Sequence, residues 1–406
     1  MTEIDSLLEG LNPQQSEAVT HTGGPLLVVA GAGSGKTRVL TRRIAYLMSS
    51  RHVAPYQILA ITFTNKAAGE MKERVADLVG PIAKSMWVST FHSACVRILR
   101  QEAARLGYSN SFSIYDSADS QRLITIVAKE LNLDLKRYPA RQFQAMISDA
   151  KNELLGPQDY LNAASNQFEQ VVADVYAVYQ QRLVRANAMD FDDLIFKAVE
   201  VLQRYPEAKA RFRSRFRHVL VDEYQDTNHA QYILVKELVG SELEGQPTAE
   251  LCVVGDADQS IYGFRGATIR NILQFELDYP NARTVLLEQN YRSTQNILNA
   301  ANAVITKNES RKEKNLWSDA GSGSPLTGYV AESEHDEANF IANEIMSLQR
   351  DGVSTPGDTA IFYRTNAQSR VFEEVFMRNA LPYKVVGGLR FYERREVKDL
   401  LAYLRV

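Results

Sequence analysis

The segment from Leu26 to Met48 constrains the fold more than any other part of the sequence. Five apolar residues, Leu26–Ala30, run into a glycine-rich stretch, and a helical pattern follows it directly. Glycines let the backbone curl until its N–H groups point at phosphate oxygens, and the N-terminus of the following helix adds positive potential. The pattern therefore predicts a strand, a phosphate-binding loop (P-loop) and a helix, with alanine in place of the usual first glycine. The loop residues are Ala30, Gly31, Ala32, Gly33, Ser34, Gly35, Lys36 and Thr37.

Two side chains carry the chemistry of this loop. Lys36 is placed to contact the β- and γ-phosphates of a nucleotide, and the Thr37 hydroxyl is placed to hold Mg²⁺. A chance glycine-rich turn is the alternative, and the position between a strand and a helix argues against it. The predicted ligands are ATP and Mg²⁺.

Short apolar runs recur along the chain, with helical segments between them. Their hydrophobicity is continuous rather than alternating, which is typical of strands buried on both faces in a parallel sheet. Strands that alternate with helices predict an α/β fold. The composition, 45% hydrophobic and 23% charged, is that of an ordinary globular chain. The runs are Leu26–Ala30, Ile58–Phe63, Met86–Thr90, His218–Asp222, Leu251–Gly255, Thr284–Leu287 and Thr359–Tyr363.

The alternation of strands and helices stops between Phe91 and Phe216. This segment reads as helical throughout, and we interpret it as an insertion into the sheet domain. Residues that share one helical face within it are Val171, Val172, Val175, Tyr176, Tyr179 and Leu183. Residues 241–250 and 321–325 are predicted loops. The last residues still carry helical periodicity, so we expect the chain to be part of a longer protein.

Composition and patterning exclude several classes of protein. No run approaches the roughly 20 consecutive apolar residues of a membrane helix, and the acidic N-terminal segment lacks the apolar core of a secretory signal. Two cysteines, Cys95 and Cys252, are too few for a disulfide framework or a zinc site. A cytoplasmic location is therefore predicted. The net charge of −3 argues mildly against a nucleic-acid-binding protein, although a local groove can still be positive.

A pair of carboxylates follows the apolar run that begins at His218. Asp222 is placed to bind Mg²⁺ through water, as P-loop enzymes require. Glu223 is then placed to orient and deprotonate an attacking water. A solvated turn is the alternative, and the apolar and aromatic neighbours argue against it. A glutamate beside the metal ligand favours an ATP hydrolase over a kinase.

Aromatic residues interleave with hydroxyl and cationic residues at two places, Phe63–Lys66 and Phe91–Ser93. Such a pattern is typical of a groove in which bases of a single strand stack on rings while lysine, threonine and serine hold phosphates. The alternative for each aromatic residue is a position in the hydrophobic core. This alternative is strongest for Phe63, because Phe63 ends a strand. Tyr262 and Phe264 lie in a glycine-rich turn, which favours exposure.

These sites and the rest of the chain together resemble superfamily 1A DNA helicases of the UvrD/PcrA/Rep group, from Leu11 to the end. The resemblance rests on many motifs in the expected order. They are Leu11–Gln15 (the Q motif), Thr62–Ala68, Ser89–Ser93, Asp190–Leu194, Gly255–Ala267 (motif III), Gln289–Thr294 (motif IV), Tyr363–Arg370 and Gly387–Arg394. The tryptophan usual in motif III is Phe264 here, which keeps a stacking face of smaller area.

The resemblance implies further site residues. For the nucleotide, Gln15 reads the adenine edge, Gln259 senses the γ-phosphate, Tyr291 stacks on adenine, Arg292 acts as an arginine finger, and Arg38 and Arg74 add contacts. For the single strand, the implied contacts are Phe63, Thr64, Asn65, Lys66, Thr90, His92, Tyr262, Phe264 and Arg265. From the residues alone, Arg292 could instead form a surface ion pair. Asp192 and Asp193 are most simply an acidic cluster that complements a helix dipole.

The resemblance also implies an architecture of RecA-like P-loop sheets flanked by helices. Residues 1–90 and 217–282 would form the first lobe (1A), and residues 91–216 the helical insertion (1B). Residues 283–390 would form the first half of a second lobe (2A), and residues 391–406 the start of a truncated 2B subdomain. Motifs V and VI of the family would lie beyond Val406, so we expect weak ATP hydrolysis from these residues alone.

The function implied is that of an ATP-dependent helicase that translocates 3′ to 5′ on single-stranded DNA during repair or replication. Its partners would be single strands and single-strand/duplex junctions with 3′ tails, and no membrane. One alternative is the motor part of a helicase–nuclease. Another is a nucleotide-switched module that binds single-stranded DNA without productive turnover.

Overall fold

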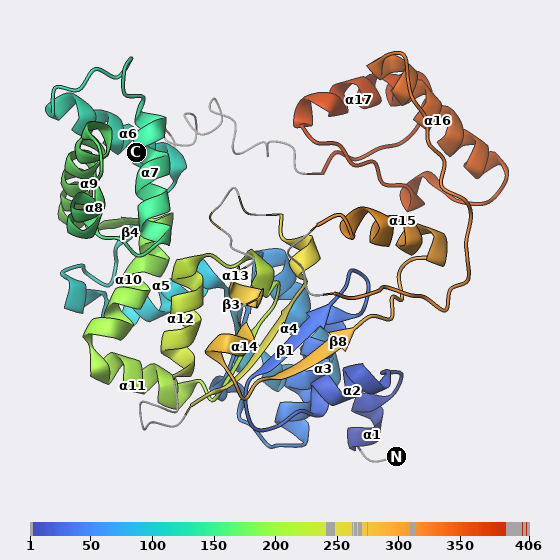
Figure 1. The fold of residues 1–406 in the computed structure, drawn as a ribbon, viewed down its shortest axis with the longest axis horizontal. Helices are drawn as coiled ribbons and strands as arrows, with labels where there is room; N and C mark the ends of the chain where they lie inside the picture. The colour runs from blue at the N-terminus through green and yellow to red at the C-terminus, as the bar shows by residue number, and fades with distance from the viewer. Residues whose placement is uncertain are drawn as a thin grey trace. The chain divides into compact units, whose positions relative to one another are not determined.

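The computed structural model describes residues 3–240, 248–261, 263, 266, 270–273, 275–308, 313–386, 400 and 403. The chain divides into two compact units, Met1–Ser324 and Pro325–Val406 (Figure 1). None of the helices in these described ranges is both long enough and apolar enough to cross a membrane.

A six-stranded parallel sheet forms the centre of the first unit, with the strand order β3-β2-β6-β7-β1-β8 (Figure 1). Its strands are β1 (Leu26–Ala30), β2 (Ile58–Thr62), β3 (Trp87–Thr90), β6 (His218–Val221), β7 (Glu250–Gly255) and β8 (Arg283–Leu287). Strands β1, β2, β3 and β6 are buried along their whole length. The α/β fold with a parallel sheet that the sequence predicted is thus confirmed.

One predicted boundary differs from the structure at β8. We placed residues 283–390 in a second lobe, but β8 pairs with β1 from Leu26↔Arg283 to Ala30↔Leu287 and completes the first sheet. A short apolar run does not reveal which sheet will accept it. As an edge strand, β8 alternates between exposed and buried residues rather than being buried throughout.

Helices cover both faces of the sheet, and successive strand residues face opposite cores. Leu27 and Val29 join one core and Leu26 and Val28 the other, as the period of two in a strand requires. The first core packs against α5 (Phe91–Glu102), α10 (Phe191–Arg204), α11 (Pro206–Arg215), α12 (His229–Val239), α13 (Arg270–Leu273) and α14 (Phe275–Asp278). The second packs against α1 (Glu3–Leu8), α2 (Pro13–Thr20), α3 (Lys36–Ser49) and α4 (Asn65–Val79).

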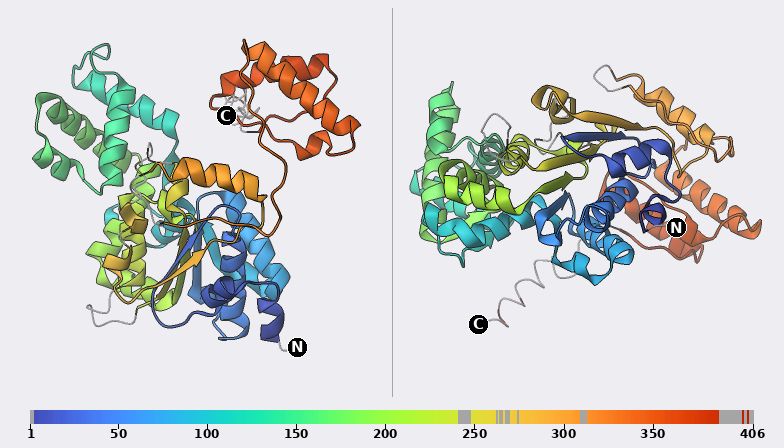
Figure 2. Two further views of the ribbon diagram at one scale, coloured as in Figure 1. Left: turned by 45° about the vertical axis from the view of Figure 1, so that its right-hand side comes forward. Right: turned by 90° about the horizontal axis from the view of Figure 1, so that it is seen from below.

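A separate hydrophobic core lies within the predicted insertion. It is built by α6 (Ser117–Glu130), α7 (Ala140–Asn152), α8 (Pro157–Ala163) and α9 (Gln167–Arg185), the teal and green helices of Figure 2. The apolar face predicted for α9 is confirmed, with Tyr176 and Tyr179 almost fully buried. The prediction of a wholly helical segment was wrong in one detail. Two short strands, β4 (Ser113–Tyr115) and β5 (Ala188–Asp190), pair in parallel at the base of this helical group.

The helices α5, α10 and α11 belong to the sheet core rather than to this helical group, although they lie inside residues 91–216. The independent core is therefore narrower than the predicted insertion and runs from Ile124 to Ala188. The last helix of the first unit, α15 (Gln295–Ile305), follows β8.

The second unit has its own small core between α16 (Glu334–Arg350) and α17 (Ser369–Arg378). The strand predicted at Thr359–Tyr363 was wrong, since none of the described residues of this unit form a strand. No strand among the described residues pairs with the run, and Phe362 is 93% exposed. The motif at Gly387–Arg394 lies outside the described residues.

Candidate active site

The phosphate-binding loop connects β1 to α3 at the carboxyl end of the sheet. Gly33 and Gly35 have φ angles of 68° and 88°, the left-handed region that residues with a Cβ rarely adopt. The Ser34 hydroxyl donates to the Gly31 carbonyl over 2.8 Å and closes the loop on itself. Lys36 and Thr37 then open the 14-residue helix α3, whose N-terminal amides face the loop. The predicted strand–loop–helix unit is present.

The two carboxylates predicted for the site follow β6, two positions from β1 in the sheet. Asp222 is 6% exposed, and burial, reinforced by the charge of Glu223 and opposed by Lys36, raises the pKa of Asp222 to about 6. Glu223 has a left-handed backbone, with φ of 50° and ψ of 43°. A non-glycine residue held in this region costs on the order of 1–3 kcal/mol, and such strain clusters at functional sites.

Three of the predicted catalytic groups meet in one hydrogen-bonded chain. The Lys36 Nζ donates to Glu223 Oε2 over 3.2 Å and to Gln259 Oε1 over 3.3 Å. Gln259 ends η6 (Ala257–Gln259), directly after β7, the strand between β6 and β1. Because the strands are parallel, their carboxyl ends bring these distant residues to one edge of the sheet.

Sequence reasoning gave no role to Gln225, which links two parts of the site. This amide is 1% exposed, and its Nε2 donates to Glu223 Oε2 over 2.8 Å. Its Oε1 accepts from the Asp256 backbone N–H over 2.9 Å. Gln225 therefore holds the turn after β6 against the turn after β7. Its place in η4 (Tyr224–Asp226), two residues after Glu223, is the signal that could have identified it.

Gln15 lies beneath the loop rather than open to a ligand. It is fully buried, its Nε2 donates to the Ser34 carbonyl over 2.9 Å, and its Oε1 accepts from the Asn12 N–H over 3.1 Å. Asn12, the N-cap of α2, donates through its own side chain to the Tyr291 hydroxyl over 3.0 Å. The structure thus brings Gln15 and Tyr291 to the same side of the loop. The contact of Gln15 with adenine stays a prediction, since both of its polar groups already have partners.

The segment that carries Arg292 packs directly on the phosphate-binding loop. The Tyr291 N–H donates to the Gly33 carbonyl over 2.9 Å, and Asn290 Nδ2 donates to the Ala32 carbonyl over 2.6 Å. A Cβ added to Gly33 would lie 2.7 Å from the Arg292 Cβ, so the loop and this segment touch only because residue 33 is glycine. Arg292 itself is exposed. Asn290, 2% exposed, is a further residue that sequence reasoning missed.

The two other predicted nucleotide-contacting arginines are placed differently. Arg38 is exposed on the first turn of α3, beside the loop. Arg74 is exposed on α4, where its guanidinium lies 3.8 Å from Glu70. The structure therefore brings Arg38 to the loop, whereas the contact of Arg74 with a nucleotide stays a prediction.

A groove lies at the carboxyl end of the sheet, where β2 and β3 end. Thr62, Phe63, Thr90, Phe91 and His92 line it from the sheet side. Further lining residues come from α7, α10 and the segment after β6, among them Asn152, Asp192 and Asp226. The predicted contacts Phe63, Thr90 and His92 are therefore brought together, while Thr64, Asn65 and Lys66 are exposed at the start of α4. Tyr262, Phe264 and Arg265 lie outside the described residues.

The aromatic residues of the groove are packed and exposed to different extents. Phe63 is half-buried and meets the buried Phe91 edge to face, with ring centroids 6.0 Å apart. His92 meets Phe191 in the same way at 5.8 Å, and burial lowers the pKa of His92. Phe191 lines the neighbouring pocket rather than the groove itself, and it is 50% exposed, which is unusual for a phenylalanine. Sequence reasoning assigned Phe191 no contact.

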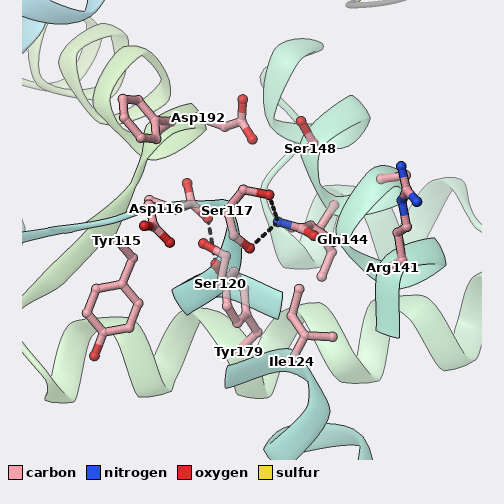
Figure 3. Close-up of a pocket in the computed structure, with 14 residues that line it drawn as sticks. Tyr115, Asp116, Ser117, Ser120, Ile124, Arg141, Gln144, Ser148, Tyr179 and Asp192 are labelled. Atoms are coloured by element: carbon pink, nitrogen blue, oxygen red, sulfur yellow. Dashed lines mark hydrogen bonds between the residues drawn. The ribbon is translucent and has the colours of Figure 1, made fainter. Parts of the chain in front are cut away.

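A second pocket lies between α6, α7 and α10 and shares Ala145, Ser148 and Asp192 with the groove. Figure 3 shows its polar lining, in which Gln144 donates to the hydroxyl and carbonyl of Ser117. Burial, together with the charge of Asp190, raises the pKa of Asp192 to about 7.

Comparisons with known proteins agree with this arrangement. The protein-family model described as UvrD/REP helicase N-terminal domain matches residues 11–280. The family model described as UvrD-like helicase C-terminal domain matches residues 285–406. The chain is 62% identical over 407 residues to the ATP-dependent DNA helicase UvrD1 of Mycobacterium tuberculosis, covering 99% of this chain and 53% of that protein. It is 54% identical over 402 residues to the ATP-dependent DNA helicase PcrA of Bacillus subtilis, covering 99% and 54%. The chain spans about half the length of the curated relatives it matches.

Proposed function

This chain belongs to the UvrD/REP helicase family, and from that premise we propose that it hydrolyses ATP to drive movement along single-stranded DNA and to separate strands. The observation that carries the proposal is the meeting of Lys36, Glu223 and Gln259 beside the phosphate-binding loop. Polarity from 3′ to 5′, and a preference for junctions with 3′ tails, are part of the proposal through the family resemblance. The cytoplasmic location stays a prediction.

The residues around Asp222 fit a hard divalent cation. Burial and the neighbouring Glu223 carboxylate make the negative charge of Asp222 unfavourable, which is why the pKa of Asp222 is raised. A bound cation would stabilise that charge. We propose that Asp222, through water, and the Thr37 hydroxyl hold Mg²⁺, which prefers oxygen ligands. The ion, when bound, neutralises charge on the phosphate oxygens.

We propose a task for each catalytic side chain, and the hydrogen bonds of Lys36 support these assignments. Lys36 is held by Glu223, and a bound γ-phosphate competes for the same ammonium group. When Lys36 turns to the phosphate, the Glu223 carboxylate becomes available to orient the attacking water and accept its proton. Gln259, which also bonds Lys36, is then placed to sense the γ-phosphate. Arg292, beside Gly33, stabilises the charge that develops during transfer.

We propose that the groove beyond β2 and β3 holds the single strand. Bases stack on exposed rings, while Lys66 and the hydroxyl residues at the N-termini of α4 and α5 bind phosphates. Thr64 and Thr90 are the N-caps of these two helices, so the helix amides lie beside the hydroxyls. The stacking roles of Tyr262 and Phe264, and the contact of Arg265, stay predictions.

The test of the proposed function joins two measurements on the purified chain. ATP hydrolysis is followed with and without single-stranded DNA, and strand separation is followed on fluorescent duplexes with a 3′ tail, a 5′ tail or blunt ends. We expect weak hydrolysis that single strands stimulate, and any strand separation to be confined to the 3′-tailed duplex. Binding of ATP and DNA without turnover would favour the nucleotide-switched module instead.

Replacing Phe191 with alanine tests whether the strand passes the groove residue His92, which Phe191 contacts edge to face. Loss of one stacking face should weaken binding of single-stranded DNA by about 1–3 kcal/mol, with little dependence on base sequence. ATP affinity without DNA should not change. Fluorescence anisotropy with several labelled oligonucleotides measures the affinity. Tyr56→Ala is the matched control, because Tyr56 is 57% exposed but precedes β2, at the opposite edge of the sheet. Equal affinities for the parent and Phe191→Ala would place the strand elsewhere.

A further inference from the structure

A lysine is buried beside the site at a position to which sequence reasoning gave no role. Lys314 has only 3% of its side chain exposed, and its ammonium group pairs with the carboxylates of Asp256 and Asp258. Asp256 is equally buried, and Asp258 is 10% exposed. Burial of a lysine is costly unless the charge is paired, so the two carboxylates account for its presence inside the protein.

Asp256 connects this lysine to the catalytic groups. One of its oxygens accepts from Lys314 and the other accepts from Gln259 Nε2. The Oε1 atom of the same Gln259 amide accepts from Lys36 Nζ over 3.3 Å. A continuous polar chain therefore runs from Lys314 through Asp256 and Gln259 to the lysine of the phosphate-binding loop. The orientation of the Gln259 amide, which end is oxygen and which nitrogen, is set by this chain.

The residues that follow Lys314 contact the phosphate-binding loop and the segment that carries Arg292. Leu316 covers the loop so closely that a Cβ added to Gly31 would lie 2.2 Å from its Cδ2. The Trp317 carbonyl accepts from the Asn290 N–H over 2.8 Å, two residues before Arg292. Residues 313–317, which we name the strap, thus contact the turn after β7, the loop after β1 and the segment after β8.

We propose that Lys314 is a positioning residue that orients Gln259 toward the γ-phosphate, and this inference rests on the proposed function. Lys314 holds the Asp256 carboxylate at one oxygen, and the other oxygen accepts from Gln259. With Gln259 fixed, its Oε1 faces Lys36 and the phosphate, and the amide distinguishes a nucleotide with a γ-phosphate from one without. Through the strap, the same lysine joins this sensor to the segment that carries Arg292.

The first experiment compares ATP and ADP affinity in the full chain, using fluorescent analogues of both nucleotides. Lys314→Met keeps most of the side-chain volume but removes the charge, and we expect the preference for ATP over ADP to fall by about tenfold. ADP affinity, which depends on the loop itself, should stay at the parent value. Lys314→Arg, which keeps the charge, should restore part of the preference. Lys307→Met, at an exposed lysine after α15, is the matched control and should behave like the parent.

A second pair of variants decides the question if Lys314→Met does not fold. Asp256→Asn weakens the acceptor that orients Gln259, whereas Asp258→Asn leaves the bond between Lys314 and Asp256 in place. We expect the preference for ATP to fall in Asp256→Asn and to persist in Asp258→Asn. An equal effect of the two would overturn the proposal, as would an unchanged preference in Lys314→Met. An equal loss of ATP and ADP affinity would do so too, since it indicates a purely structural role. A parent chain that binds neither nucleotide would contradict the proposed function instead.

Discussion

Replacing Glu223 with glutamine should leave ATP binding intact and slow ATP hydrolysis by roughly 10²–10⁴-fold, the usual contribution of a general base. Glutamine keeps the size of the side chain and one acceptor oxygen, but it cannot accept the proton of the attacking water. The substitution also removes the carboxylate that pairs with Lys36 over 3.2 Å. ATP should therefore bind at least as tightly as it does to the parent, because the phosphates no longer compete with Glu223.

The measurement is a single-turnover hydrolysis rate together with a nucleotide titration, both in the presence of saturating single-stranded DNA. Glu207→Gln, at an exposed glutamate on α11, makes the same chemical change away from the site and should hydrolyse ATP at the parent rate. Similar rates in Glu223→Gln and the parent would eliminate the role given to Glu223. Loss of ATP binding would indicate that Glu223 shapes the site rather than the reaction.

Replacing Lys151 with methionine should destabilise the chain by about 3–5 kcal/mol, the usual cost of breaking a buried ion pair by removing one partner. Lys151 on α7 is fully buried, 2.7 Å from Asp190 and 2.9 Å from Asp193 at the start of α10. Burial opposes its charge, but the two carboxylates raise the pKa of Lys151 well above its ordinary value. Without the ammonium group, two carboxylates remain buried together with no cation between them.

The loss of stability in Lys151→Met should increase as the pH rises. Burial and the charge of Asp190 already raise the pKa of Asp193, and the variant loses the lysine that opposes them. A carboxylate with a raised pKa in the folded state favours folding at low pH and loses that contribution as pH rises. The deficit of Lys151→Met should therefore be smallest in acid and grow toward neutral pH.

Chemical denaturation at several pH values measures both effects. Lys129→Met, at an exposed lysine on α6, is the matched control and should change the free energy of unfolding by no more than about 0.5 kcal/mol. A deficit that does not vary with pH would contradict the account of the two carboxylates. The predicted acidic cluster, Asp192 and Asp193, does lie in the first turn of α10, and Asp193 also pairs with Lys151. Asp190 is the N-cap of α10 and accepts from the Asp193 N–H over 2.8 Å.

Local features of the chain could be predicted because they depend on neighbours in sequence. Strand β1 has the predicted bounds Leu26–Ala30, since five consecutive apolar residues can only be accommodated where both faces are covered. Gly33 and Gly35 adopt positive φ angles where the phosphate-binding loop requires them.

The features that could not be predicted depend on partners far apart in the chain. The hydrogen bonds of Gln15 to the Ser34 carbonyl and the Asn12 N–H are an example, while its contact with a base stays a prediction. The run at Thr359–Tyr363 is apolar like β1, but no strand in the part of the chain that the structure describes pairs with it, and a strand exists only through pairing.

By itself, the sequence determined the α/β architecture, the phosphate-binding loop and the carboxylates after β6, because local patterns of burial and backbone freedom specify each of them. Only the tertiary structure decided which charges would be buried together. Lys314 lies 58 residues from Asp256, and Lys151 lies 39 residues from Asp190. A lysine in a sequence is usually a solvated surface residue. Its role changes only when folding removes water from it and supplies carboxylates, and those neighbours come from other strands and helices.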